Sequence, residues 1–266
     1  MMRLLLIIAN PYKLHIVRKA AIPKGKPVIY ASTHGFKDDI QIAYILMNDH
    51  AYLQLGGLDH FFKSPQGILA WLIGVALVDR YDKNSRAASL PKMKLAMQFG
   101  ANILMFPEGA WNLTDSLLVR KLYSGVYRLA MSENALIIPI ATHIENKNCY
   151  AILDEPFDIS VYDKEKGLCV LRDKMGSLKF ELMEQYSSFS RNELESAGKS
   201  LKAAWEEQKE VLLYESKHYR SKKHELYTPY YIDKSITVYA EAFAHLRDIK
   251  ITKDNAFLLR PDRFEK

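Results

Sequence analysis

The stretch that decides the fold is Pro27-Val-Ile-Tyr-Ala-Ser-Thr-His34-Gly-Phe-Lys-Asp38-Asp39. It predicts a short buried strand, a turn that carries a histidine, and an amphipathic helix that opens on two carboxylates. On one continuous helix, side chains five residues apart point roughly 140° away from each other. His34 and Asp39 can therefore meet only if the backbone turns between them.

That turn gives the two side chains a chemical use. With His34 in the turn and Asp39 in the first helical turn, the carboxylate can reach one imidazole nitrogen. The other nitrogen then faces the open end of the sheet as a general base. Asp38 lies nearer the helix start, so we assign the helix cap to Asp38 and the histidine contact to Asp39. In the alternative interpretation, both carboxylates serve only as helix caps.

Strand and helix patterns alternate along the next hundred residues. The predicted strands are 28–33, 51–55, 74–80, 101–106, 136–143 and 149–153, and the predicted helices between them are 38–48, 84–99 and 117–133. Pro139 cannot donate to a ladder, which places it at an edge, an end or a bulge. This alternation predicts an α/β fold, a mostly parallel central sheet flanked by helices, with a helical C-terminal extension.

Three segments follow from this pattern. Residues 1–20 contain a predicted helix over 3–19, which is either a packing helix or an interfacial anchor with its basic residues toward anionic lipid. Residues 21–180 form the α/β domain. Residues 181–266 form the helical extension, with helices predicted to span 171–188, 190–217 and 235–248 and to pack on the core.

Two further strands end in residues suited to a binding site. Arg80 follows the strand that begins at Gly74, and Glu108 follows the strand that begins at Ala101. Parallel strands of an open α/β sheet bind ligands at their carboxyl ends, so both residues are expected beside His34. The arginine offers a planar fork for a phosphate, although a salt bridge with Asp79 would explain it as well. A lone glutamate in a turn is usually solvated. Here, however, three predicted strands bring His34, Arg80 and Glu108 to the same edge of the sheet, which favours a site role for Glu108.

Composition limits the partners and the compartment. A net charge of +6 fits an anionic partner, and no nucleic-acid motif is present. Cys149 and Cys169 have no metal-ligand spacing or disulfide framework, which indicates reduced thiols in the cytoplasm and no metal site. The longest apolar run, Ile68 to Val78, is too short to cross a bilayer. The chain is therefore expected to be soluble or peripheral on the cytoplasmic face of a membrane.

Four elements in this order carry a resemblance to a known family: His34-Gly-Phe-Lys-Asp-Asp39, Gly74-Val-Ala-Leu-Val-Asp-Arg80, Phe106-Pro107-Glu108-Gly109 and Ile138-Pro139-Ile140. Together they resemble the glycerolipid acyltransferases, whose best-known members act on 1-acyl-sn-glycerol-3-phosphate. The resemblance implies that His34 is the general base and that Asp39 fixes its tautomer. It also implies that Arg80 and the loop from Phe106 to Gly109 hold the acceptor. The donor would be an acyl thioester of coenzyme A or acyl carrier protein, with no other cofactor.

The loop after Gly109 departs from the family pattern. Many members continue with Thr-Arg, whereas this chain continues with Ala110-Trp111-Asn112. Trp111 and Asn112 offer stacking and hydrogen bonding in place of the arginine, which suits a different headgroup. The resemblance implies an acceptor that is lysophosphatidic acid or a related lysophospholipid. Two other functions could use the same residues at the carboxyl ends of the strands. One is binding of a lipid or phosphate without catalysis, and the other is hydrolysis of acyl esters or thioesters.

Overall fold

The computed structural model describes residues 2–8, 10–36, 38–56, 74–78, 83–112, 114, 117–187, 193, 196, 198 and 203. All of them lie in the first of the two compact units of the chain, Met1–Tyr227. The predicted helix over 235–248, and nearly all of the one predicted over 190–217, lie outside the described residues. The predicted division at residues 20 and 180 stays a prediction, although one helix, Lys164–Tyr186, runs through residue 180 without interruption.

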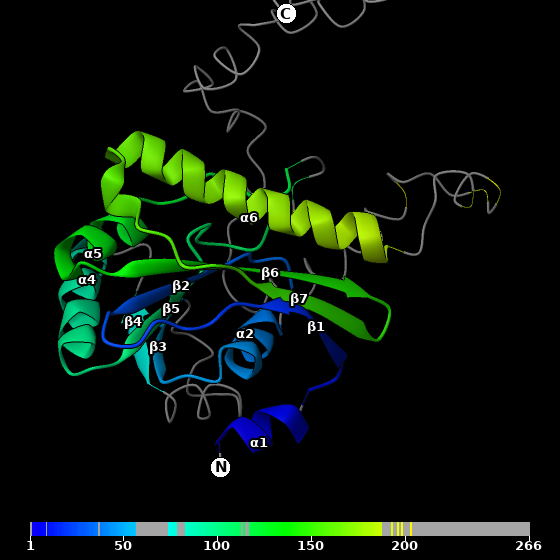
Figure 1. Cartoon of the computed structure of the whole chain (residues 1–266), viewed down its shortest axis with the longest axis horizontal. Helices are drawn as coiled ribbons and strands as arrows, with labels where there is room; N and C mark the ends of the chain where they lie inside the picture. The colour runs from blue at the N-terminus through cyan, green and yellow to red at the C-terminus, as the bar shows by residue number, and fades with distance from the viewer. Residues whose placement is uncertain are drawn as a thin grey trace, which may run out of the picture. The chain divides into compact units, whose positions relative to one another are not determined.

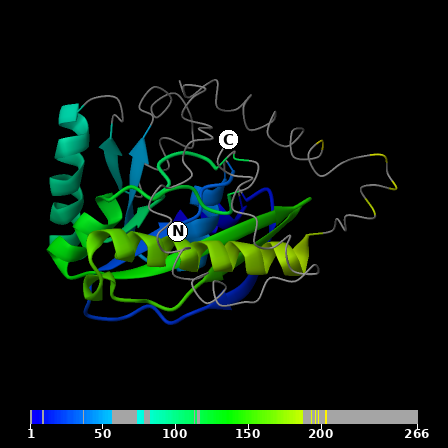
Figure 2. The same ribbon diagram turned by 90° about the horizontal axis from the view of Figure 1, so that it is seen from above.

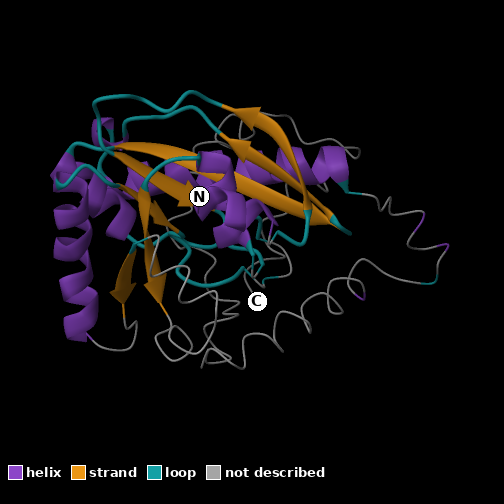
Figure 3. Cartoon of the chain, turned by 90° about the horizontal axis from the view of Figure 1, so that it is seen from below, coloured by secondary structure: helices purple, strands orange, loops and turns teal. Residues whose placement is uncertain are grey.

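The sheet has seven strands in the order β1-β7-β6-β2-β5-β3-β4. All neighbours are parallel except β6 and β7, which are antiparallel. The strands are β1 Lys13–Lys19, β2 Val28–Ser32, β3 Ala51–Gly56, β4 Val75–Val78, β5 Asn102–Met105, β6 Leu136–Glu145 and β7 Asn148–Leu153. Figures 2 and 3 show β3 and β4 side by side at one end of the sheet, next to the helix α4, Lys83–Gln98. The predicted mostly parallel α/β sheet is confirmed.

Helices cover both faces of this sheet, as Figure 1 shows. On one face lie α1 Met2–Ile8 and α2 Asp39–Met47; on the other lie α4 Lys83–Gln98, α5 Gly125–Glu133, the 3-10 turn η2 Ile159–Val161 and α6 Lys164–Tyr186. Every residue of β2 is buried, as expected for a central parallel strand covered on both faces. Tyr30 packs toward α2 and Ile29 toward α5 and α6. The strand that precedes His34 is thus fixed from both sides.

The predicted helix over 3–19 is wrong in its second half, because residues 13–19 form β1. Pro11 stands between α1 and β1, and proline disfavours a helical conformation in the residue before it. β1 then pairs with β7 from Lys13 to Lys19 and protects an edge that would otherwise be open. Arg18 ties the strand to α6 through two hydrogen bonds to Glu181, 2.9 and 3.2 Å long.

Pro139 lies inside β6, opposite Ala31 of β2, and not at the end of the strand. The position still suits proline. The carbonyl of Pro139 accepts from the Asp154 backbone N–H, so its nitrogen also faces the β7 side. The ladder between β6 and β7 begins only at the next residue, Ile140. The predicted placement of Pro139 at an edge, an end or a bulge of its strand is wrong, but its missing N–H falls where the ladder with β7 ends.

Candidate active site

The carboxyl ends of β2 and β5 meet at the site. These strands are hydrogen-bonded neighbours in parallel register, from Ile29 opposite Ile103 to Ala31 opposite Met105. His34 follows β2 by two residues and Glu108 follows β5 by three. The backbone N–H of His34 donates to Glu108 Oε1 over 2.9 Å. The predicted convergence of these two residues is confirmed.

The predicted contact between His34 and Asp39 is present. His34 Nδ1 lies 2.8 Å from Asp39 Oδ2, and the same oxygen accepts the backbone N–H groups of Gly35, at 3.1 Å, and Phe36, at 3.4 Å. The Asp39 side chain is 0% exposed and that of His34 is 17% exposed. Because a carboxylate with three N–H neighbours is an acceptor, Nδ1 is the protonated nitrogen and Nε2 carries the free lone pair. Burial holds the pair rigidly in this arrangement.

Asp38 is the residue before α2, as predicted, but its carboxylate makes no capping hydrogen bond. It instead faces Tyr12, whose pKa is raised by burial and further by the charge of Asp38 and a hydrogen bond to it. Asp39, as the first residue of α2, places its own charge at the positive end of the helix dipole. The assignment of the histidine contact to Asp39 is therefore confirmed, and the capping role of Asp38 is wrong.

Two aromatic rings hold the imidazole of His34 on its other side. The Phe106 ring lies 4.4 Å from the imidazole centroid, tilted by 35°, and the Trp111 ring lies at 6.0 Å, edge-on. Among the described residues, none forms a hydrogen bond with Nε2. The imidazole is thus fixed by Asp39 and by ring contacts, while its basic nitrogen remains available to a bound hydroxyl.

Both carboxylate oxygens of Glu108 accept hydrogen bonds from the protein backbone, and its predicted contact with the acceptor stays a prediction. Its side chain is buried, with the residue 1% exposed. Its two oxygens accept the backbone N–H groups of His34, at 2.9 Å, and Arg120, at 2.8 Å. Burial raises the pKa of this carboxyl to about 7, against the lowering effect of those two N–H groups and of the nearby His34 and Arg120 charges. Glu108 therefore clamps the histidine turn to residue 120.

The loop after Glu108 is fixed by contacts of its own. Gly109 has φ +70°, and a Cβ there would lie 2.6 Å from a ring carbon of Tyr123. The Pro107 carbonyl accepts from the backbone N–H of Tyr123 at 2.8 Å. Asn112 donates its backbone N–H to the His34 carbonyl, at 2.6 Å, and its side-chain amide to Leu117. The side-chain amide of Asn112 thus closes its own loop, and the prediction that this side chain binds a headgroup stays a prediction.

Arg120 is a site residue that the sequence analysis did not single out. The predicted helix over 117–133 is wrong in its first half: α5 begins at Gly125, and the segment before it crosses the Glu108 loop. In that segment Arg120 supplies the backbone donor to Glu108, and its guanidinium donates to the Trp111 carbonyl at 3.3 Å. The helical pattern continues upstream of residue 125 without a break in hydrophobicity, so only Gly125 itself signalled the later start.

Arg80 lies outside the described residues, so its predicted place beside His34 at the carboxyl ends of the strands stays a prediction. Within the described ranges, no cluster of three or more histidine, cysteine, aspartate or glutamate side chains is arranged to hold a metal ion. A search of the same residues also found no helix with the length and apolar character needed to span a bilayer.

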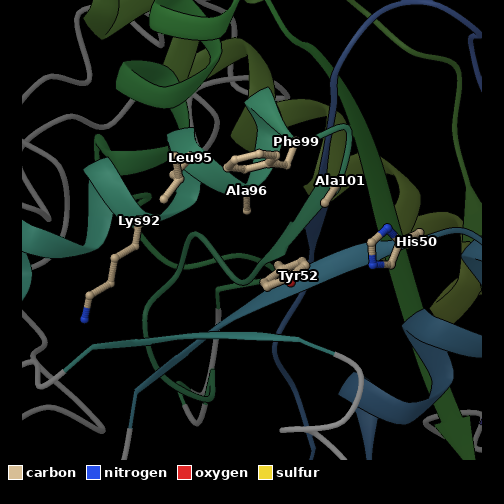
Figure 4. A pocket seen from close by; sticks show the side chains of 7 residues that line it. All are labelled: His50, Tyr52, Lys92, Leu95, Ala96, Phe99 and Ala101. Carbon is tan, nitrogen blue, oxygen red and sulfur yellow. The ribbon is translucent and has the colours of Figure 1, made fainter.

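A cavity of about 310 Å³ lies at the opposite end of the sheet (Figure 4). His50 and Ala101, which line it, directly precede β3 and β5, so the cavity lies at the amino ends of these strands. The other lining side chains are those of Tyr52, Lys92, Leu95, Ala96 and Phe99. Ligands of open α/β sheets bind at the carboxyl ends, where His34 and Glu108 lie, so this cavity is separate from the candidate active site.

A known protein shares the fold of this chain. The solved structure of the 1-acyl-sn-glycerophosphate (LPA) acyltransferase PlsC from Thermotoga maritima matches with a TM-score of 0.55 at 16% identity, covering 71% of this chain and 80% of that one. The shared fold is thus that of an α/β acyltransferase. A family model described as Acyltransferase matches residues 13–143. The matched residues make up just under half of the chain.

Among curated proteins, a 1-acyl-sn-glycerol-3-phosphate acyltransferase of Chlamydomonas reinhardtii is 26% identical over 130 residues. The matched region is 48% of this chain and 38% of that relative. The chain therefore spans well under half of the relative's length. The family match includes the His34 turn and the Glu108 loop, since the family model extends from residue 13 to residue 143.

Proposed function

We propose that this protein transfers a fatty acyl group from an acyl thioester to the hydroxyl of lysophosphatidic acid or a related lysophospholipid. The single observation that carries the proposal is the buried pair of His34 Nδ1 and Asp39 Oδ2, 2.8 Å apart, with Nε2 left free at the carboxyl ends of the strands. The names of the two similar proteins point to the same class of acceptor.

The chemistry needs one base and no covalent intermediate. Nε2 of His34 takes the proton of the acceptor hydroxyl as that oxygen attacks the thioester carbonyl. Asp39 stabilises the imidazolium that forms, because it already accepts the Nδ1 proton. The tetrahedral intermediate collapses to the new oxygen ester and a thiolate, which recovers the proton from His34. Atoms and charge balance without a metal or another cofactor.

Three residues are candidates for holding the acceptor. Trp111 is partly exposed beside the imidazole and offers a ring for the glycerol or headgroup. Arg120 brings a guanidinium next to the carbonyl of Trp111, the position at which many glycerolipid acyltransferases carry an arginine. Arg80 remains a proposed phosphate ligand from the end of β4. A lysophospholipid phosphate would suit these guanidinium groups.

The acceptor is a lipid, so we propose that the protein works as a peripheral protein on the cytoplasmic face of a membrane. Three apolar side chains of α1 are exposed, and Ile8 is the most exposed of them, at 73%; the set is Leu5, Ile7 and Ile8. Exposed apolar side chains on a short helix, in a chain of net charge +6, suit shallow contact with an anionic lipid surface. The donor is acyl-coenzyme A or acyl carrier protein carrying an acyl chain.

A matrix of donors and acceptors tests the proposal. Purified protein is given acyl-coenzyme A or acyl carrier protein substrates, each with lysophosphatidic acid, other lysophospholipids or no acceptor, and thiol, phospholipid and free fatty acid are quantified. We expect thiol and phospholipid to appear in equal amounts, and neither with the His34→Ala variant. Equal rates for the wild type and this variant would refute the base mechanism. Free fatty acid without acceptor would identify a hydrolase, and lyso-lipid binding without turnover would identify a non-catalytic binder.

A further inference from the structure

The peptide group that joins Val119 to Arg120 is held at both of its ends. At one end, Nε–H of Arg172 in α6 donates to the Val119 carbonyl over 3.1 Å. At the other end, the Arg120 backbone N–H donates to Glu108 Oε2 over 2.8 Å. A trans peptide group is planar, and its carbonyl and N–H point to opposite sides. The two partners therefore fix both the position and the orientation of this group.

The segment around this peptide group has no regular secondary structure of its own. Residues 117–124 belong to neither a helix nor a strand. Val119 is nevertheless buried, and its side chain packs into the core cluster that contains Leu122 and, from α6, Leu171. A buried carbonyl outside a helix or a sheet needs a donor from elsewhere in the protein. Arg172 is that donor for Val119.

Arg172 is well placed in α6 for this contact. Figure 1 shows α6 lying along one face of the sheet. Leu171 and Met175 of this helix are buried in the same core cluster as Val119, so the helix and the segment pack together. Arg172 itself is partly exposed, at the border of that apolar contact. Its guanidinium keeps its charge at pH 7, and a hydrogen bond from a charged donor is stronger than one from a neutral donor.

The carboxylate at the other end of this peptide group also holds the histidine turn. Glu108 accepts the Arg120 N–H with Oε2 and, over 2.9 Å, the His34 N–H with Oε1. A continuous chain of hydrogen bonds thus runs from the Arg172 guanidinium, through one peptide group and one carboxylate, to the backbone of His34. Hydrogen bonds in such a chain polarise and strengthen one another. A cation on the Val119 carbonyl therefore makes the Arg120 N–H a better donor to Glu108.

The same segment also supports the loop beside the imidazole. The guanidinium of Arg120 donates to the Trp111 carbonyl over 3.3 Å, and the Trp111 ring lies 6.0 Å from the imidazole of His34. A displaced peptide group between residues 119 and 120 would therefore disturb two supports of the site. One is the bond from Glu108 to the backbone of His34, and the other is the contact that holds Trp111.

We propose that Arg172 is a positioning residue of the acyl transfer, which orients Glu108 through the peptide group after Val119 and so holds His34 in its active position. The contact comes from α6, Lys164–Tyr186, which lies beyond the residues 13–143 that the family model matches. The helix therefore supports the site in addition to covering the sheet. The inference rests on the proposed function of His34.

The kinetic test compares two substitutions of Arg172 with a matched control on the same helix. Arg172→Met removes the donor, Arg172→Lys keeps a charged donor, and Lys166→Met removes an exposed cation from α6. We expect Arg172→Met to lower kcat about tenfold and to leave the donor KM within about twofold, because a small displacement of a general base costs rate more than binding. Arg172→Lys should recover most of that loss, and Lys166→Met should keep kcat within about twofold.

A double substitution tests whether the effect passes through Glu108. In Glu108→Gln an amide nitrogen replaces one carboxylate oxygen, so one of the two backbone N–H groups loses its acceptor and the chain from Arg172 is broken. Adding Arg172→Met to this variant should then lower kcat by less than about a further twofold. The full tenfold loss in both backgrounds would mean that Arg172 acts independently of Glu108, and the inference would be wrong.

Amide hydrogen exchange, followed by NMR, gives a readout that does not depend on turnover. We expect Arg172→Met to speed exchange at the Arg120 and His34 amides about tenfold, with the amides of β2 within about twofold and no change in Lys166→Met. This pattern in a protein inactive on every donor would refute the proposed function but support the positioning of the turn by Arg172. An active protein in which Arg172→Met matches Lys166→Met, or in which the β2 amides speed up equally, would overturn the inference.

Discussion

The two ends of the parallel sheet differ in what they offer a ligand. At the amino ends of β3 and β5 lies an open cavity of about 310 Å³, lined by Tyr52 and by a Phe99 that is 84% exposed. At the carboxyl ends of β2 and β5, Asp39 bonds to the His34 imidazole and Glu108 bonds to two backbone N–H groups, with hydrogen bonds between 2.8 and 2.9 Å long. Catalysis depends on side chains held in a fixed geometry more than on the volume of a cavity. The hydrogen-bonded carboxyl ends of the strands are therefore better suited to chemistry than the amino ends.

We expect the largest difference in kcat between substitutions of two histidines, His34 at the carboxyl ends of the strands and His50 at the amino ends. We expect His34→Ala to lower kcat on the order of 10²- to 10⁴-fold, the usual contribution of a general base. His50→Ala, at the rim of the amino-end cavity, should keep kcat within about twofold. Thiol release from acyl-coenzyme A with lysophosphatidic acid measures both, and thermal melting checks that both variants fold. A comparable loss in the two variants would erase the distinction between the ends.

The next largest difference in kcat is expected between substitutions of two adjacent residues near His34, Asp39 and Asp38. Asp39→Asn should lower kcat about 10- to 100-fold, because an amide no longer favours the imidazolium and can hold the wrong tautomer. Asp38→Asn should change kcat by less than about threefold, since Asp38 interacts with Tyr12 and not with His34. The same assay, run at saturating acceptor, compares the two. The reverse order of effects would move the catalytic partner to Asp38.

Sequence reasoning succeeded where one local pattern decides the geometry. The alternation of buried strands and helices predicted the parallel sheet, and a strand followed by a turn and a helix predicted that His34 meets Asp39. Both outcomes depend on residues close in the sequence or on a sheet rule that acts equally on every strand.

It failed where a distant segment supplies the partner. The Glu108 carboxylate accepts from backbone donors at residues 34 and 120, and no local pattern reveals those partners. Residues 13–19 were expected to be helical, and they became a strand because β7 offered an edge.

A smaller difference, in stability, is expected between alanine substitutions of two glycines, Gly100 before β5 and Gly109 after it. Gly100 and Gly109 both have positive φ, +86° and +70°, so alanine is strained at either, by about 1 kcal/mol. Only at Gly109 would the new Cβ also meet a neighbour, a Tyr123 ring carbon 2.6 Å away. We expect Gly109→Ala to lose about 1 kcal/mol more stability than Gly100→Ala in urea unfolding, and to lower kcat as well. Gly109→Ala with Tyr123→Ala should recover the difference.

The smallest effect concerns the amino-end cavity itself. Phe99→Ser and Leu95→Ser remove exposed apolar side chains from its lining, and neither residue belongs to the buried core. Since the cavity and His34 lie at opposite ends of the strands, kcat and the KM values for donor and acceptor should stay within about twofold of the wild type. The measurement is a full kinetic comparison across acyl-chain lengths. A rise in donor KM that grows with chain length would show instead that the acyl chain reaches this cavity, and the two ends of the sheet would then form one substrate path.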